Sequence, residues 1–100
     1  MSKKLFNKKI KIEIIKQKLS SDNVWIPEYI LWNELWASAS IKYVSVRRVI
    51  YFFIIKWRKY FPNNFRITMD DKNFMPTQIP IVDPSNDYIM FHAAQITKGE

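Results

Sequence analysis

The distribution of apolar residues along the chain predicts one dominant element, a helix over residues 45–61 (SVRRVIYFFIIKWRKYF). At 100° per residue, this segment divides into two halves. One half is apolar and comprises Val46, Val49, Ile50, Phe53, Ile54, Trp57, Tyr60 and Phe61. The other half carries the cations Arg47, Arg48, Lys56, Arg58 and Lys59, together with Tyr51, Phe52 and Ile55. Ser45 suits the N-cap, and Pro62 ends the helix.

The segments before this helix show two competing patterns. Residues 9–14 alternate between charged and apolar side chains, which favours a strand, whereas apolar residues from Phe6 to Leu19 also recur at helical spacing. The lysine and glutamate content suits a helix, so we expect a helix over residues 3–19, with residues 8–15 open to either interpretation. Residues 20–23 form a turn and residues 24–26 a very short strand. Pro27 then occupies the first position of a second helix, which covers residues 29–36.

The segments after Pro62 are more polar and read as a small sheet. Residues 65–69 alternate as a strand, residues 70–73 form a turn, and residues 78–82 form a return strand at an edge, because Pro80 cannot donate a backbone hydrogen bond. Residues 83–87 form another turn, and the apolar residues 88–91 cover the sheet. The predicted fold is therefore mainly α with a small antiparallel β hairpin (α+β). This is the layout of a winged helix-turn-helix: one domain over residues 1–92 and a flexible tail over residues 93–100.

Residues 44–67 (VSVRRVIYFFIIKWRKYFPNNFRI) resemble a known family of regulators. The shared features are the arginine pair after a hydroxyl residue, the aromatic-aliphatic run, the basic cluster at Arg58 and Lys59, and the start of a strand at Phe65. A helix before Trp25 is also similar. On these residues the chain resembles the CaiF/GrlA family of bacterial transcriptional regulators. The resemblance covers residues 10–82 and implies a winged helix-turn-helix whose recognition helix is residues 45–61.

The charge distribution favours a polyanionic partner. The chain has 100 residues, a formal net charge of +7 and a pI near 9.7. Residues 1–18 carry a net +6, residues 19–68 carry +4, and residues 69–100 carry −3. Clustered lysine and arginine bind duplex DNA by releasing the counterions condensed on its phosphates. We therefore expect a small DNA-binding transcriptional regulator that uses the basic helix and a β wing.

Individual residues can be given roles in that interaction. Arg47, Arg48 and Tyr51 lie in the N-terminal half of the predicted helix, where a recognition helix meets base edges. Lys42, Arg58, Lys59 and Lys72 suit phosphate contacts. The predicted nucleic-acid site therefore comprises Lys42, Ser45, Arg47, Arg48, Tyr51, Arg58, Lys59 and Lys72.

Other kinds of chemistry have little support in the sequence. The chain has no cysteine, one histidine (His92) and one glycine (Gly99), so we expect no thiolate metal site and no glycine-rich phosphate loop. Asp70, Asp71, Asp83 and Asp87 read as turn residues and not as metal ligands. We therefore expect no enzymatic activity, no cofactor and no metal. The longest apolar run, residues 49–55, is far shorter than a membrane span, and residues 1–11 do not read as a signal peptide, so a cytoplasmic protein without membrane insertion is expected.

Two alternatives to DNA binding fit the same residues. The chain could be a protein-interaction module, an adaptor or inhibitor of another regulator or host factor, that uses its exposed aromatic residues. The basic amphipathic segment could instead lie on a membrane surface. Homodimerisation is compatible with each of these functions, and no residue pattern decides for or against it.

Overall fold

The computed structural model describes residues 6–83, 85 and 87–96, and within them it contains seven β-strands and no helix. The prediction of a mainly α winged helix-turn-helix is therefore wrong, as is the winged-helix fold that the family resemblance implied. The strands are β1 (Lys8–Leu19), β2 (Trp25–Val44), β3 (Val49–Lys56), β4 (Phe65–Met69), β5 (Lys72–Pro76), β6 (Ile81–Val82) and β7 (Tyr88–Gln95). Within the described residues there is therefore no recognition helix.

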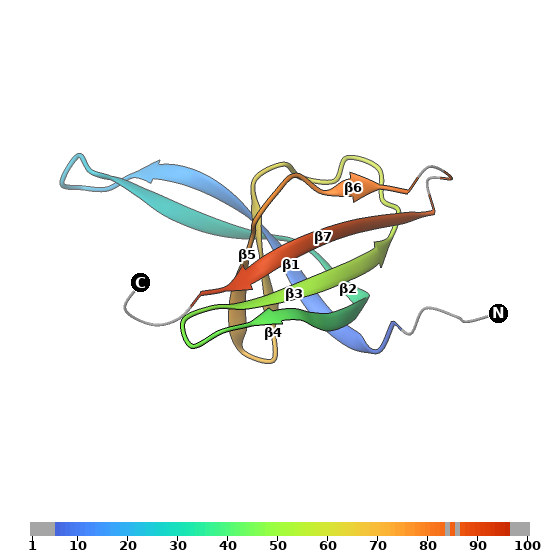
Figure 1. Cartoon of the computed structure of the whole chain (residues 1–100). Coiled ribbons are helices and arrows are strands. Elements are labelled where there is room, and N and C mark those ends of the chain that lie inside the picture. The colour runs from blue at the N-terminus through green and yellow to red at the C-terminus, as the bar shows by residue number, and fades with distance from the viewer. Residues whose placement is uncertain (1–5, 84, 86, 97–100) are drawn as a thin grey trace.

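The strands form one antiparallel sheet that closes on itself (Figure 1). Their order is β3-β2-β1-β4-β5-β7-β6, and an additional pairing of β3 with β7 joins the first strand to the sixth. Six strands therefore make a closed ring, and the two-residue strand β6 lies beside β7 outside that ring. Closure matters because it leaves the six ring strands without long unpaired edges around the core.

Alternate residues of the ring strands fill its interior. Phe53 is fully buried and lies 5.6 Å from Phe74 and 5.5 Å from Phe91, measured between ring centroids. Every residue in the core is apolar, and no buried side-chain polar atom among the described residues lacks a partner. The buried residues are Ile10, Ile12, Leu35, Ala37, Phe53, Ile55, Phe65, Ile67, Met69, Phe74, Ile89, Phe91 and Ala93.

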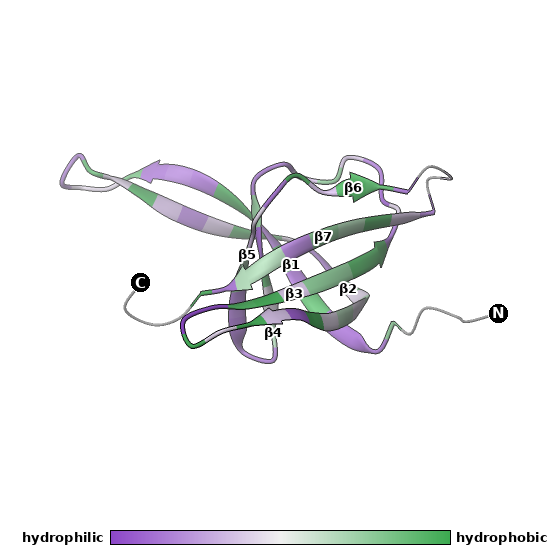
Figure 2. Cartoon of the chain, viewed as in Figure 1, coloured by the Kyte–Doolittle hydropathy of each residue, from purple (hydrophilic) through white to green (hydrophobic). Residues whose placement is uncertain are grey.

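The predicted helix over residues 45–61 is a turn, a strand and a loop. Ser45 does not cap a helix: its amide donates to the carbonyl of Arg48 at 2.8 Å, and its Oγ accepts a hydrogen bond from the Arg48 amide. β3 then covers only Val49–Lys56, the apolar run that is green in Figure 2. Residues at alternate positions point inward and outward, so Ile55 is buried while Ile54 is half-buried on the outside.

The helices predicted over residues 3–19 and 29–36 are also wrong, because the described residues of both segments lie in strands or beside them. Residues 8–19 form β1, so the period-two alternation of residues 9–14 was the correct signal, and residues 24–26 and 29–36 lie on or beside the 20-residue strand β2. Residues 3–5 of the first predicted helix lie outside the described part of the chain. The strand tolerates its lysines because Lys9 and Lys11 lie on the outer face of β1, while Lys8, Lys16 and Lys18 lie beyond the buried positions and are exposed.

Several features after Pro62 are confirmed. The strand over residues 65–69 is β4, and Asp70 and Asp71 form its turn, both with positive φ (52° and 63°). The predicted hairpin partner is wrong, because β4 pairs with β5, which begins at Lys72 inside the predicted turn. Of residues 78–82 only Ile81–Val82 form a strand, β6, and it pairs with β7. Residues 88–91 belong to β7, which runs on to Gln95 and so includes residues 93–95, where the tail was predicted to begin.

Neither a membrane-crossing helix nor a metal cluster is found in the described ranges. No helix there is long and apolar enough to span a bilayer. Likewise, no three histidine, aspartate or glutamate side chains among residues 6–83, 85 and 87–96 are grouped so that they could hold a metal ion.

Candidate protein-binding arm

The hairpin of β1 and β2 extends beyond the closed ring (Figure 1). β4 pairs with β1 only from Lys11 to Ile14, and β3 pairs with β2 only from Ser38 onward. Residues 15–31 are therefore a two-stranded ribbon with no third strand, and we call this ribbon the arm. An isolated two-stranded hairpin is at best marginally stable in water, so the arm depends on local devices and on its attachment to the ring.

A β-bulge separates the arm from the ring. Ile12 pairs with Asn33 and Glu13 pairs with Leu31, so Trp32 has no partner on β1. The Trp32 ring packs against Phe61 in an edge-to-face contact with a centroid distance of 5.5 Å. Bulges bend a strand and increase its twist, so this residue marks the position at which the hairpin leaves the closed sheet.

The register assigns the side chains of the arm to two faces, since residues directly opposite in an antiparallel pair share a face. The outer face continues the outside of the ring, and its cross-strand pairs are Glu13–Leu31, Ile15–Tyr29, Gln17–Pro27 and Leu19–Trp25. The inner face carries the pairs Ile14–Ile30, Lys16–Glu28 and Lys18–Ile26. All the aromatic residues of the arm therefore lie on its outer face.

The apolar side chains on the outer face are unusually exposed. Trp25 is 65% exposed, Leu31 56% and Leu19 48%. Soluble monomers seldom expose contiguous apolar patches beyond a few hundred Å², and those that do commonly use them as interaction sites. Every residue from Ser21 to Leu31 is exposed, so much of this apolar surface stays in contact with solvent.

The tip of the arm is a well-defined turn. Ser20 Oγ accepts hydrogen bonds from the amides of Asp22 (3.3 Å) and Val24 (3.2 Å), and the Ser20 amide donates to the Val24 carbonyl at 2.9 Å. Asn23 adopts a left-handed conformation with φ of 63°, which asparagine tolerates better than most residues. The turn predicted at residues 20–23 is thus confirmed, and it fixes the register of the arm.

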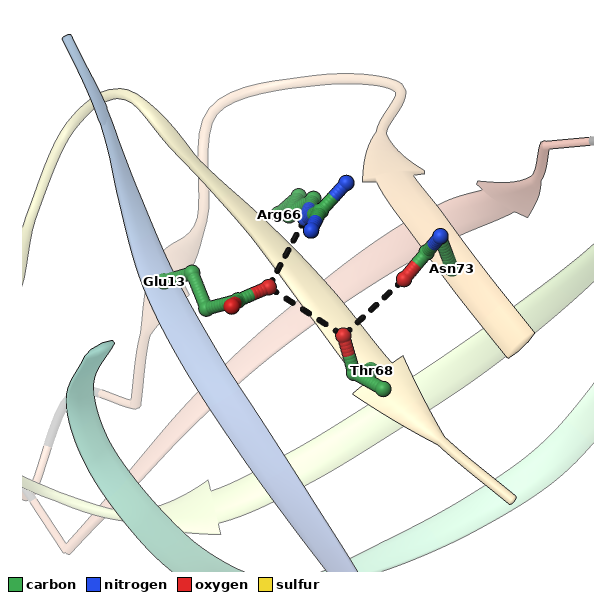
Figure 3. Close-up of polar contacts among 4 residues, drawn as sticks. All are labelled: Glu13, Arg66, Thr68 and Asn73. Carbon is green, nitrogen blue, oxygen red and sulfur yellow. Dashed lines mark hydrogen bonds and ion pairs between the residues drawn. The ribbon is translucent and has the colours of Figure 1, made fainter. Parts of the chain in front are cut away.

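Arg66 of β4 holds the base of the arm. Its Nε donates to Glu13 Oε1 at 2.7 Å, and its guanidinium carbon lies 3.5 Å from the centroid of the Tyr29 ring. Figure 3 shows how the same carboxylate oxygen also accepts from Thr68 Oγ1 at 3.2 Å, while Thr68 contacts Asn73 on β5 at 3.0 Å. Three strands of the ring are therefore linked to the arm through one polar network.

Asn64 adds a second attachment at the same place. The Ile15 amide donates to the Asn64 carbonyl, and Asn64 Nδ2 donates to the Ile15 carbonyl, both at 3.1 Å. These contacts continue the pairing of β4 by one residue into the arm. The base of the arm is thus rigidly held, whereas its outer end is supported only by its own hairpin.

The residues predicted to bind nucleic acid lie in separate parts of the fold. Lys42 is on β2; Ser45, Arg47 and Arg48 are in the turn between β2 and β3; Arg58 and Lys59 follow β3; and Lys72 begins β5. Tyr51 packs toward the interior, 5.1 Å from Phe74 between ring centroids. No helix face gathers these residues, and duplex-DNA binding by them stays a prediction.

The sequence analysis did not predict the arm, although the sequence contains an alternating pattern that is typical of a strand. Trp25, Pro27, Tyr29 and Leu31 alternate with period two, and they follow a turn that ends in Asn23. Pro27 and the helical spacing of the neighbouring apolar residues favour a helix over the same residues. A proline is compatible with a strand when its nitrogen faces no neighbouring strand, and the arm has one open edge on each side.

Comparison with known proteins identifies the fold and no family. No family model matches the chain, and no curated protein matches it by sequence. Protein SF1141 from Shigella flexneri 2a is similar in structure, with a TM-score of 0.75 and 15% identity over 98% of this chain and 99% of that one. A chain of the virion of a native gene transfer agent particle also has a TM-score of 0.75, with 13% identity over 90% of this chain and 94% of that one. At these identities the likeness establishes a shared fold only.

Proposed function

We propose that this protein is a structural subunit of a larger protein particle and that it joins a neighbouring subunit through the outer face of its arm. The observation that carries the proposal is the exposed apolar series on this face. Trp25 lies opposite Leu19, and Tyr29 lies opposite the half-buried Ile15. Leu31 lies opposite Glu13 at the base. Full burial of one large apolar side chain contributes roughly 1.5–3 kcal/mol, so a few such residues suffice to anchor an interface.

The attachment of the arm supports the same function. A docking element must present its contact surface in a fixed direction, because ordering a mobile segment on binding costs free energy. Arg66 and Asn64 fix the base of the arm, and the Ser20 turn fixes its tip. The similarity to a chain of a gene transfer agent virion is consistent with assembly into a particle.

The test is whether the protein sediments with particles in cells that carry its gene. Particles are separated on a density gradient, and the epitope-tagged chain is detected in each fraction. We expect the unmodified chain in the particle fractions and a Trp25→Ser, Leu31→Ser double variant at the top of the gradient. The matched control is Ile26→Ser with Ile30→Ser, which alters two exposed residues on the inner face of the same arm.

The possible outcomes decide the proposal. Co-sedimentation that is lost only in the outer-face variant supports it. Absence of the unmodified chain from every particle fraction contradicts it, as does unchanged co-sedimentation of the outer-face variant. Circular dichroism of each purified variant verifies that the substitutions leave the sheet intact.

A further inference from the structure

A pocket that is separate from the arm lies where β2 and β3 diverge. Its volume is about 470 Å³, within the range of roughly 300–1,000 Å³ that is usual for ligand sites. The described residues that line it are Phe6, Leu35, Trp36, Lys56 and Arg58. It therefore combines two aromatic rings, one aliphatic side chain and two cations.

The charged side chains among the described residues that line the pocket are all cations. Lys56 and Arg58 are exposed, and neither makes an ion pair with any described residue. A third cation, Lys9, has its Nζ 5.0 Å from the centroid of the Trp36 ring. No carboxylate is among the described lining residues. A ligand that carries negative charge beside an apolar or aromatic group would complement this surface.

The backbone beside the pocket has an open strand edge. β3 pairs with β2 as far as the pair Ile54–Ser38, and beyond it Ile55 and Lys56 pair only with β7. β2 continues to pair with β1 on its other side through Ala37, Trp36 and Leu35. In the described part of the chain no strand therefore occupies the β3-facing edge of these three residues, although the pocket lies next to it.

From the charge and the open edge together, we propose that this pocket binds a short acidic peptide segment of another protein as an added strand. The segment pairs with the open edge of β2, places an aromatic or aliphatic side chain between Trp36 and Phe6, and directs its carboxylates to Lys56 and Arg58. Backbone pairing gives affinity in this mode, and side-chain pockets at alternate positions give specificity.

The geometry limits the length of the segment. The Ser38–Ile54 pair closes one end of the open edge, and the contact of Trp32 with Phe61 closes the other. At about 3.3 Å per residue, the five residues between these limits accommodate a segment of roughly four to five residues. This site does not depend on the arm, so the two proposals stand or fall separately.

The test uses a fluorescein-labelled pentapeptide of alternating glutamate and phenylalanine, titrated with the protein at an ionic strength of about 0.15 M and followed by fluorescence anisotropy. We expect saturable binding that weakens by about tenfold or more in a Lys56→Glu, Arg58→Glu double variant, since each cation supplies a charge-assisted hydrogen bond. Lys16→Glu with Lys18→Glu makes the same change of net charge on the arm and should alter the affinity by less than about twofold.

Three results would overturn the proposal: no saturable binding, equal weakening by both double variants, or tighter binding of a labelled five-nucleotide thymidine DNA than of the peptide. The last result would assign the pocket to single-stranded nucleic acid instead. A peptide with alanine in place of phenylalanine should bind more weakly, and equal binding would remove the aromatic pocket from the mechanism. If the charge-reversed variant does not fold, Lys56→Gln with Arg58→Gln replaces it in the same comparison.

Discussion

The guanidinium carbon of Arg66 lies 3.5 Å from the centroid of the Tyr29 ring, which brings a cation from the closed ring directly over an aromatic residue of the arm. The same side chain pairs with Glu13, and both partners of that ion pair retain only 20% side-chain exposure. Partial burial reduces solvent screening, so this contact stabilises the structure more than a fully exposed pair does. Its position at the junction makes it one of the contacts that fix the arm's direction, together with the Asn64–Ile15 hydrogen bonds.

Replacement of Arg66 should therefore loosen the arm. We expect Arg66→Ala to lower the free energy of unfolding by about 2 kcal/mol, because it leaves Glu13 without its cation and removes the contact with Tyr29. Amide hydrogen exchange over residues 15–31 should accelerate more than exchange in β7. Arg66→Lys keeps the charge but not the planar guanidinium, so its exchange rate in the arm should fall between those of the unmodified protein and of Arg66→Ala. Equal exchange rates in the arms of all three proteins would contradict this role.

Removal of the arm should leave the ring folded. None of the buried core residues lies between residues 15 and 31, so a variant in which Asn-Gly replaces residues 17–27 keeps the whole core. Lys16 and Glu28 are directly paired, and because Ile15 uses its backbone groups for Asn64, alternation makes Lys16–Glu28 a hydrogen-bonded pair, which a two-residue turn of this composition suits. We expect cooperative thermal unfolding with a change in Tm of only a few degrees. Loss of cooperative unfolding would show that the arm is part of the core.

The neighbours Ile54 and Ile55 distinguish a strand from a helix. In β3, Ile55 is fully buried and Ile54 lies on the outer face, whereas a helix would bury Ile54 and expose Ile55. We expect Ile55→Ala to cost about 2–5 kcal/mol of unfolding free energy, and Ile54→Ala to cost less than half of that. Urea denaturation of both variants measures the difference, and the opposite ranking would contradict the closed sheet.

The turn between β4 and β5 offers a stabilising substitution. Asp71 has a φ of 63° and directly follows Asp70, which also has positive φ. A two-residue hairpin turn of this kind favours glycine at its second position, because glycine has no Cβ to clash in the left-handed region. We expect Asp71→Gly to raise the free energy of unfolding by about 1 kcal/mol. Asp71→Ala, which keeps the Cβ, should give no such gain.

The turns and the alternating segments were the parts of the fold that the sequence could predict. Ser20 and Asn23 carry local turn chemistry, and Phe65 to Met69 alternate strictly, so both features follow from short-range physics. Residues 49–55 are apolar without interruption, and periodicity alone cannot separate a buried strand from a helix in such a run. Their richness in β-branched and aromatic residues was the better indicator.

The functional surfaces were less predictable because they depend on register and closure. Trp25 and Leu31 reach the same exposed face through cross-strand pairing with residues 13–19, and no local pattern specifies that pairing. The pocket is lined by Trp36 from β2 and by Arg58 from the loop after β3, which are distant in the sequence. The predicted basic residues were real surface cations, but the helix expected to bring them together does not exist.

The pairing of β3 with β7 closes the ring between residue 50 and residue 94. During synthesis, the apolar strand β3 around Phe53 is therefore made well before β7, the strand that pairs with its free edge. A ribosome-bound chain that ends short of residue 88 would display that edge to other nascent chains, a hazard for sheets that depend on distant contacts. C-terminal truncation should thus reduce soluble yield in cells far more than loss of the same number of residues from the arm.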